Sequence, residues 1–478
     1  MSVARPALEY IDKIKVQLDM KRSTRALKRM AKYGKPYLGW IVLIALLSVF
    51  RSRLFTLEPL YTSEIIDTVV INKDYDLLRG LLIKIFLAVT GFGLSNFAVV
   101  FINGYIAKRM IRDIRSDYYA SLQEKSFDFH DSSAVGDLIS RATMDLQPVD
   151  MFLAQGVGTL CDAVFTSITA SAVMFSVNRK MSLLAIFLIL LTFYFNVGLF
   201  TKTMPIFRKM QLILGRISAY IQQNILGMKN VRIFCREDEM EEGFKTIEGR
   251  YINTALSAGR LQSIYTPAAE AALGLGVTII YVYGTNLILA PEAILTIGNL
   301  LLFARYMRRM TNPLRNVSMV IGQWVNASAG FERVTDVIDA KVTVQDRDDA
   351  KDLEIARGEV EFKDVSFGYV PDTLVLRDIN IKADPGEKIA ILGATGSGKT
   401  SLISLIARFY DPVGGSVAID GVDIRDYTLL SLRRQMGLVL QDVFLFAGTV
   451  KDNITFGKPE ATMEEVIAAA KLAHIHEF

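Results

Sequence analysis

The sequence predicts a mainly α-helical membrane domain followed by an α/β domain, and three features of the 478-residue chain lead to that prediction. Hydrophobic residues make up 51% of the chain and its mean hydropathy is +0.30, values typical of a membrane protein. Charged residues still make up 22%, so the charge has to be concentrated in particular regions. After about residue 325 the long apolar runs stop and alternating apolar residues begin, which indicates a second domain.

Six apolar segments are long enough to cross a bilayer, which needs roughly 20 mostly apolar residues. They run from about 37 to 60, 81 to 106, 151 to 177, 181 to 203, 264 to 290 and 294 to 310. Buried helices of a large soluble protein are the alternative, but soluble helices rarely stay apolar on all sides for so long. We therefore expect six transmembrane helices.

Lys and Arg side chains indicate the orientation of these helices, because positively charged loops face the cytoplasm. Residues 1–36, 108–141 and 202–260 are basic, whereas the intervening connections carry few positive charges. Both termini are then cytoplasmic. We expect a basic N-terminal arm at 1–36 and, at 37–325, a six-helix domain whose two long cytoplasmic excursions form helical hairpins.

The C-terminal part of the chain predicts strands around one short helix. Residues 326–357 are charged and suit a linker, and 358–478 form the second domain. Apolar residues alternate in GEVEFKDVSFGYV, as in half-buried strands. The runs KIAILG and MGLVL predict buried central strands, AIDGVD predicts a strand and turn of an outer sheet, and SLISLIARFY has helical spacing.

The loop GATGSGKT between KIAILG and this helix is a phosphate-binding P-loop by its spacing and context. Its glycines let backbone N–H groups turn inward around phosphates, and the helix N-terminus favours negative charge. Lys399 reaches the terminal phosphates, and the Thr400 hydroxyl can bind Mg²⁺. We predict nucleotide binding by Gly393, Ala394, Thr395, Gly396, Ser397, Gly398, Lys399, Thr400 and Ser401.

Two further residues are ambiguous by themselves. Tyr369 ends a predicted strand upstream of the loop, where its ring could stack on a base, although a tyrosine in a strand is more often part of the core. Gln441 follows MGLVL and by itself is simply the polar end of a strand. The net charge of +4, with no basic tract interleaved with aromatic residues, argues against nucleic-acid binding.

With these motifs in place, the chain resembles the half-transporters of the ATP-binding-cassette (ABC) exporter family, in which six spans are fused to one nucleotide-binding domain. The resemblance covers almost the whole chain. FHDSSAVGDLISRATMD and AYIQQNILGMKNVRIFCRE resemble the family's two cytoplasmic loops, although Gln222 and Gln223 stand where the family usually has glutamate. VSFGYVPDTLVLRDINIKADPGEKIAILGATGSGKTSL and LVLQDVFLFAGTVKDNITFG resemble two cassette segments.

The resemblance implies roles for particular residues and a transport cycle. Tyr369 would stack on adenine, Gln441 would contact the metal ion, and Lys399 and Gln441 would take part in catalysis, with ATP and Mg²⁺ as cofactors. Two half-transporters, identical or related, would close on two ATP molecules. Segments 132–137 and 227–234 would transmit that motion, so that a small molecule, lipid or peptide is exported across the bacterial inner membrane.

In the family, a signature loop, an acidic strand with the catalytic glutamate and a switch histidine follow the segments matched here. The predicted fold is therefore a mainly α membrane domain of six transmembrane helices with long cytoplasmic extensions, fused to an incomplete α/β P-loop nucleotide-binding domain. Two interpretations stay open. The chain is either an ABC-type transport ATPase whose sequence is incomplete or whose gene is interrupted, or a nucleotide-binding membrane subunit that does not hydrolyse ATP.

Arginines inside two predicted spans suggest a cargo site. Arg51 and Arg53 lie in the first span and Arg305 in the sixth. Arginines inside a membrane usually face protein or water. These three either pair with Glu58 or Glu64 or reach the outer lipid headgroups, or line a substrate cavity that favours anionic or amphipathic cargo.

Overall fold

The computed structural model describes residues 20–71, 73–290, 295–370, 373–441 and 443–477. The chain divides into two compact units. The first comprises Met1–Lys125 and Ser132–Lys341, and the second comprises Ser126–Asp131 and Val342–Phe478. A short piece of the first predicted excursion therefore belongs to the second unit.

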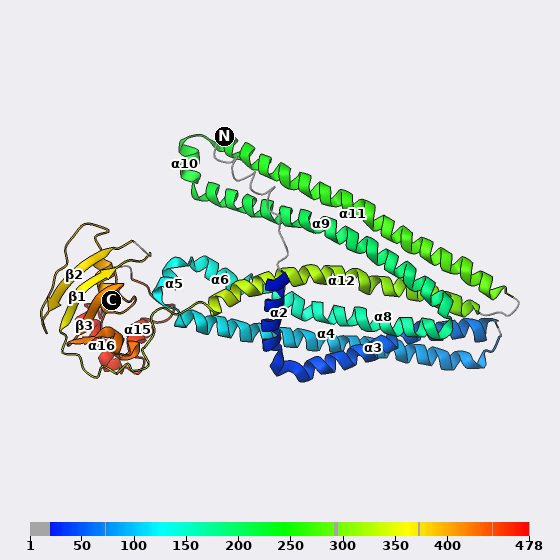
Figure 1. Cartoon of the computed structure of the whole chain (residues 1–478), viewed down its shortest axis with the longest axis horizontal. Coiled ribbons are helices and arrows are strands. Elements are labelled where there is room, and N and C mark those ends of the chain that lie inside the picture. Colours follow the sequence, from blue (N-terminus) through cyan, green and yellow to red (C-terminus); the bar gives the residue numbers. More distant parts are fainter. Residues whose placement is uncertain (1–19, 72, 291–294, 371–372, 442, 478) are drawn as a thin grey trace. The chain divides into compact units, whose positions relative to one another are not determined.

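The first unit is built almost entirely from long helices (Figure 1). The long ones are α2 (Met20–Gly34), α3 (Leu38–Glu64), α4 (Asp76–Glu124), α8 (Val157–Val177), α9 (Arg179–Leu226), α11 (Glu237–Ile288) and α12 (Ile297–Ile338). Shorter turns of helix join them: η1 (Lys35–Tyr37), η2 (Ile65–Ile71), α6 (Val135–Thr143), α7 (Gln147–Met151), η3 (Phe152–Gly156) and α10 (Met228–Ile233). Both predicted excursions are helical, since α4 and α9 continue unbroken well beyond their apolar segments.

Five helical stretches among the described residues are long and apolar enough to cross a membrane. They are Lys28–Ile71, Asp76–Glu124, Val135–Val177, Arg179–Leu226 and Glu237–Ile288. The sixth predicted segment lies in α12 from residue 297 onward; residues 295 and 296 precede this helix and residue 294 is outside the described residues. Within it α12 is helical, but Arg305, Arg308 and Arg309 interrupt its apolar stretch, so α12 is not one of the five.

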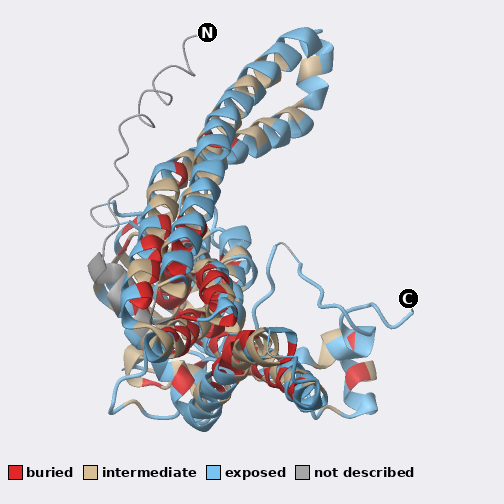
Figure 2. Ribbon diagram, turned by 90° about the vertical axis from the view of Figure 1, so that its right-hand side faces the viewer, coloured by how far each residue is buried: buried red, intermediate tan, exposed pale blue. Residues whose placement is uncertain are grey.

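The core of the first unit lies where α8, α9, α11 and α12 meet. Met174, Met181, Ile280, Phe303 and Met307 are fully buried there. α11 packs closely against α12, because a Cβ atom on its Gly284 would come within 2.4 Å of Leu300. Small residues of this kind let membrane helices approach one another. Figure 2 shows the buried residues concentrated at this junction, whereas the far end of the α9–α10–α11 arm is largely exposed.

The second unit contains an antiparallel sheet of strand order β2-β1-β3-β4 in its described residues. The strands are β1 (Val360–Phe367), β2 (Leu376–Ala383), β3 (Gly414–Ile419) and β4 (Val422–Asp423). Its helices are α5 (Phe127–Ser132), α13 (Lys399–Ile406), α14 (Leu429–Arg434), α15 (Val450–Ile454) and α16 (Met463–Leu472), with the short turns η4 (Ile424–Asp426) and η5 (Thr455–Gly457).

Alternation along β1 correctly predicted a half-buried strand, since Phe362, Val365 and Phe367 face the core. The predicted strand and turn in AIDGVD are also confirmed. Asp420 and Gly421 form the turn between β3 and β4 with φ values of 52° and 81°. These left-handed values suit glycine, and aspartate tolerates them better than most residues.

The prediction of buried central strands at residues 388–393 and 436–440 is wrong. The structure assigns neither segment to a strand, and Leu392 and Val439 are 91% and 96% exposed. A buried strand needs neighbours on both sides to pair its N–H and C=O groups. No described strand lies beside either segment, so the apolar runs alone could not produce strands.

Candidate functional site

Two glycines shape the predicted phosphate loop. Gly396 and Gly398 have φ values of 84° and 91°, which strain any residue with a side chain. Gly398 also lies so close to β2 that a Cβ atom would come within 2.7 Å of Leu376. The N–H of Ser397 donates to the carbonyl of Ala394 at 3.2 Å, which closes the turn, and α13 begins at the next residue after Gly398.

Lys399 is held across this loop. Its ammonium group donates to the carbonyls of Gly393 at 2.9 Å and Ala394 at 2.8 Å. Lysine is a flexible point charge with three donors, so it can exchange such neutral acceptors for phosphate oxygens. The turn, the helix N-terminus and the ammonium group together fit the phosphate chain of a nucleotide.

The two predicted metal ligands are not brought together by any described contact. Thr400 lies in the first turn of α13, whereas Gln441 is exposed in a segment without regular structure. Across the described residues, no group of three His, Cys, Asp or Glu side chains could hold a metal ion. A hydroxyl and an amide oxygen are still suitable donors for Mg²⁺, which usually keeps several waters and phosphate oxygens as ligands.

Tyr369 lies beside the start of α13, although it is 32 residues away from Ser401 in sequence. The two hydroxyls lie 2.9 Å apart, and the Tyr369 ring meets the ring of Tyr410 edge-on at 5.2 Å. With 48% of its surface exposed, Tyr369 can still offer a ring face to a base. The sequence analysis missed Tyr410, which ends the predicted helical run ARFY.

Tyr410 also binds the short piece of the first excursion that belongs to the second unit. Its hydroxyl donates to Asp131, and burial, followed by this hydrogen bond, raises the pKa of the Tyr410 phenol above its ordinary value. The Phe127 and Phe409 rings lie 4.2 Å apart. The Ser126 hydroxyl oxygen accepts the N–H of Val344 at 3.0 Å. Residues 126–131 are thereby packed onto the second unit.

Arg408 is a further buried residue that sequence reasoning missed. Its guanidinium donates to the carbonyl of Gln345 at 2.9 Å and to Asp411 at 3.0 Å, and it is 1% exposed.

The Asp420 carboxylate holds the segment before β1 through hydrogen bonds from backbone N–H groups. Burial would raise the pKa of its carboxyl, but the N–H groups of Glu359, Arg357 and Gly358 donate to it and hold the pKa below its ordinary value.

The three candidate cargo arginines occupy different environments in the first unit. Arg51 is buried and binds Asn96 at 2.7 Å as well as Asp162. Arg53 is exposed. Arg305 binds Glu58 at 2.9 Å and lines a pocket of about 310 Å³, which we call the arginine pocket. The structure therefore does not gather the three into one site.

A larger cavity of about 710 Å³ lies between α9, α11 and α12, and we call it the amide cavity. Glu270 is the single ionisable group among its described lining side chains. Gln323 has a buried amide oxygen for which the described residues provide no donor. The other polar lining residues are Asn196, Thr203, Gln262, Thr266, Thr311, Asn312 and Asn326.

The sequence and the fold are matched by known proteins. Residues 41–314 match the family described as ABC transporter transmembrane region, and residues 376–478 match the family described as ABC transporter. A solved structure of a bacterial Atm1-family ABC exporter with ATP bound has a TM-score of 0.73 and 24% identity, and it covers 91% of this chain and 77% of that one. This likeness shows the fold.

Curated relatives extend along nearly the same residues. The uncharacterized ABC transporter ATP-binding protein YfiC of Bacillus subtilis (strain 168) is 30% identical over 95% of this chain and 74% of that protein. The putative multidrug export ATP-binding/permease protein YgaD of the same organism is 30% identical over 95% and 79%. The ATP-dependent lipid A-core flippase of Syntrophus aciditrophicus (strain SB) is 29% identical over 94% and 74%.

Proposed function

The chain belongs to the ABC transporter family, in the group that joins a membrane-spanning exporter domain to an ATP-binding domain, and we propose that it is one half of a two-chain exporter. The observation that carries this proposal is the loop at residues 393–401, in which Gly396 and Gly398 adopt left-handed backbone angles and Lys399 spans the turn. It occurs in an integral membrane protein, so nucleotide binding and membrane helices share one chain.

In this proposal each residue of the loop binds or orients ATP. The N–H groups of the loop and of the first turn of α13 contact the phosphates, and Lys399 neutralises their charge. The Tyr369 ring stacks on adenine. Thr400 and Gln441 supply protein oxygens to Mg²⁺, which when bound offsets the charge that develops on the phosphates during transfer.

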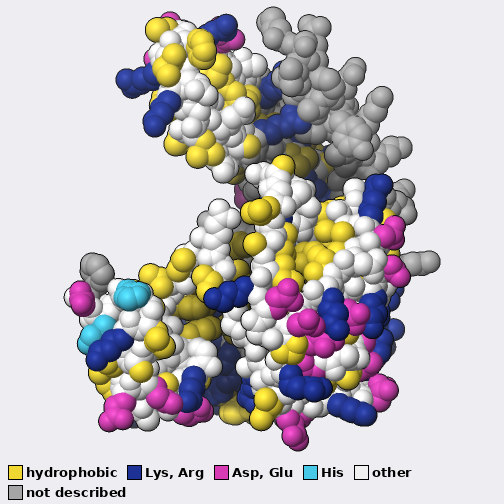
Figure 3. Space-filling model, turned by 90° about the vertical axis from the view of Figure 1, so that its left-hand side faces the viewer, with side chains coloured by type: hydrophobic (Ala, Val, Ile, Leu, Met, Phe, Trp, Pro, Cys, Tyr) yellow, Lys and Arg dark blue, Asp and Glu magenta, His cyan; other side chains and the backbone are white. Residues whose placement is uncertain are grey.

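We propose that two chains work together, and an exposed apolar surface supports this. Ile225, Leu226, Ile233 and Phe234, around α10, are between 63% and 79% exposed. Figure 3 shows hydrophobic and basic side chains together at this end of the arm. Apolar side chains gathered at a tip mark an interaction site more often than a free surface. In the proposed dimer they contact the second half-transporter, while residues 126–131 transmit motion from the second unit of their own chain.

The proposed location is the bacterial inner membrane, with both termini and the second unit in the cytoplasm. The basic segments 1–36, 108–141 and 202–260 support this orientation.

The proposed cargo is an amphiphile. Two relatives named for lipid A-core flipping and multidrug export support this breadth, as do the two pockets of different charge described above.

The test of nucleotide binding compares Lys399→Ala with Lys451→Ala on the purified full chain. Losing the ammonium group from the loop removes charge-assisted contacts to phosphate of about 1.5–3 kcal/mol, so ATP should bind at least about tenfold more weakly. Lys451→Ala removes the same charge from exposed α15 and should bind ATP as the wild type does. Equal affinity of Lys399→Ala and wild type would refute the site.

Hydrolysis and assembly need separate measurements. Phosphate release by the wild-type chain would support an ATPase, whereas ATP binding without release would support the non-hydrolysing subunit. Mass measurement in mild detergent should give a particle of two chains. A strictly monomeric particle with intact helices would contradict the two-chain proposal.

A further inference from the structure

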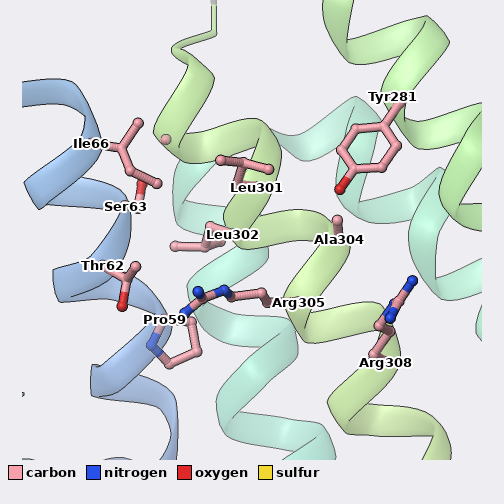
Figure 4. A pocket seen from close by; sticks show the side chains of 11 residues that line it. Pro59, Thr62, Ser63, Ile66, Tyr281, Leu301, Leu302, Ala304, Arg305 and Arg308 are labelled. Carbon is pink, nitrogen blue, oxygen red and sulfur yellow. The ribbon is translucent and has the colours of Figure 1, made fainter. Parts of the chain in front are cut away.

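The arginine pocket opens between α3, α11 and α12, inside the predicted membrane segments. Arg305 and Arg308 lie eight and eleven residues beyond the start of α12, so they are about 12 Å and 16 Å along the helix at 1.5 Å per residue. In Figure 4 the Arg305 side chain extends from α12 towards α3, whereas Arg308 lies on the same side of α12 as Tyr281. Both guanidinium groups line this one pocket, from opposite sides of α12.

Positive charge exceeds negative charge around this pocket. Arg309 follows in the same turn of α12, and a single carboxylate, Glu58, serves both neighbours, binding Arg305 at 2.9 Å and Arg309 at 2.5 Å. Arg309 has further support, since it donates to the carbonyl of Phe55 at 2.7 Å and its guanidinium lies over the Phe55 ring. Arg308 has no carboxylate partner among the described ion pairs.

A second carboxylate, Asp67, binds the lining residue Gly298 and has its own donors. Asp67 accepts the N–H of Gly298 at 2.8 Å and the Thr296 hydroxyl at 2.5 Å, so its charge is directed at the N-terminus of α12. Three arginines thus face one carboxylate that is shared and another that is already engaged. Charged groups within a membrane segment are costly unless they face a partner or a water-filled space. An anion in the pocket would supply the missing partner.

The other polar side chains of the pocket carry hydroxyl groups, of which that of Thr62 already donates to Glu58. Thr62, Ser63 and Tyr281 line it, and Figure 4 shows these side chains on the α3 and α11 sides. A guanidinium has five N–H donors, and one contact to Glu58 leaves Arg305 with donors to spare. Its planar arrangement matches the two oxygens of a phosphate or carboxylate. The remaining walls, such as Ile66 and Leu301, are apolar and suit a hydrocarbon chain.

We propose that the arginine pocket binds the phosphate or carboxylate group of an anionic amphiphile, whose apolar part lies against α3 and α12. The amphiphile is either a bilayer lipid or the cargo. Its identification as cargo rests on the proposed function, but its binding does not. The amide cavity has no Lys or Arg among its described lining residues, so this selectivity is particular to the smaller pocket.

The test uses the full chain in nanodiscs of phosphatidylcholine, titrated with dodecyl phosphate, dodecyltrimethylammonium and dodecyl maltoside. Dodecyl phosphate should bind at least about tenfold more tightly than the other two. Arg308→Gln should weaken its binding by about tenfold, and Arg305→Gln by less, since Glu58 already engages that residue. Arg250→Gln removes an exposed arginine of α11 outside the pocket lining and serves as the matched control with unchanged binding.

Further measurements distinguish a bilayer lipid from the soluble amphiphile as the ligand. They also distinguish lost binding from a misfolded chain. If phosphatidylglycerol in the nanodisc displaces dodecyl phosphate, the site binds lipid; if it does not, the site binds the soluble amphiphile, and both results support an oxyanion site. Arg308→Lys keeps the charge and should retain part of the affinity while the chain stays folded. Lys399→Ala should leave dodecyl phosphate binding unchanged. A failure of the proposed ATP site can therefore be distinguished from a failure of the arginine pocket. Equal binding of the three amphiphiles, or wild-type affinity in Arg308→Gln, would overturn the proposal.

Discussion

The arginine pocket and the amide cavity are both lined by α11 and α12, yet they differ in size and charge. The arginine pocket has about 310 Å³ and two guanidinium groups, and the amide cavity has about 710 Å³, many neutral amides and hydroxyls, and one carboxylate. One helix therefore presents positive charge near its start and neutral acceptors further along. α3 completes the first space and α9 the second, so two stretches of α12 border spaces of different charge.

The side chains that line the two spaces should favour different classes of ligand. Guanidinium groups select oxyanions, because they offer several aligned donors and a full charge. Amide side chains offer donors and acceptors alike, and the unpaired oxygen of Gln323, together with Glu270, favours ligands that carry donors such as amines or hydroxyls.

The largest expected effect comes from removing the carboxylate that balances the arginine pocket. Glu58→Gln should destabilise the chain by about 2.5–3.5 kcal/mol, because an arginine then lies within the membrane without its ion pair. Dodecyl phosphate should nevertheless bind more tightly, since the pocket becomes more positive. Thermal unfolding in detergent and amphiphile titration measure the two effects. Glu64→Gln, at the exposed end of α3, should change neither, and a loss of anion binding in Glu58→Gln would contradict the charge balance.

A second variant addresses the amide cavity. Glu270→Gln removes its ionisable group and should weaken binding of dodecyltrimethylammonium by about 1 kcal/mol, roughly fivefold, without affecting dodecyl phosphate. Glu248→Gln lies on the same helix outside the cavity lining and serves as control. If both ligands responded equally to Glu270→Gln, the two sites would not be chemically distinct.

A third variant tests whether ATP binding alters the amphiphile affinities of the arginine pocket and the amide cavity through residues 126–131. Tyr410→Phe deletes the hydrogen bond to Asp131, worth about 0.5–1.5 kcal/mol, while keeping the ring. ATP should bind as in the wild type, but its effect on the affinities of the two amphiphiles should shrink. Titrations with and without ATP measure this. An undiminished ATP effect would show that the Tyr410–Asp131 bond is not needed for transmission.

The smallest expected effect is the contribution of Asp420 to the pH dependence of stability. The pKa of Asp420 is lower in the folded than in the unfolded chain, so its stabilisation is present above the unfolded pKa and is lost as pH falls through the folded one. The gain is about 0.5–1 kcal/mol because the group is still partly in contact with water. Asp420→Asn should remove this pH dependence below about pH 4. Hydrogen exchange of residues 357–361 measures it, and neither membrane pocket should respond.

Local features of the sequence predicted much of the fold. The alternation in β1, the Asp420–Gly421 turn and the glycines of the phosphate loop depend on residues close together in sequence, and the structure bears them out. The two wrongly predicted strands show the limit of this approach. Apolar runs at 388–393 and 436–440 are compatible with buried strands, but strand formation depends on neighbours that a run does not reveal.

Contacts between distant residues were beyond sequence reasoning. Glu58 and Arg305 are 247 residues apart, and the sequence offered both Glu58 and Glu64 as partners of the arginines without deciding between them or indicating Arg309 as a second partner. Tyr369 was singled out for its place at a strand end, but its contact with Ser401 depends on how β1 packs against α13. These pairings are set by helix and sheet packing, which periodicity does not specify.

The position of Lys399 has a consequence for discrimination among nucleotides. Its ammonium group uses two of its three donors on the carbonyls of Gly393 and Ala394, so a phosphate that takes all three donors must replace both bonds. A charged oxygen on a terminal phosphate offers a stronger bond in exchange. A nucleoside monophosphate lacks the β- and γ-phosphates that a P-loop lysine contacts, so we expect it to leave these two bonds in place. The two backbone carbonyls therefore compete with the nucleotide for the Lys399 ammonium group. We expect the length of the phosphate chain to decide whether the nucleotide displaces them.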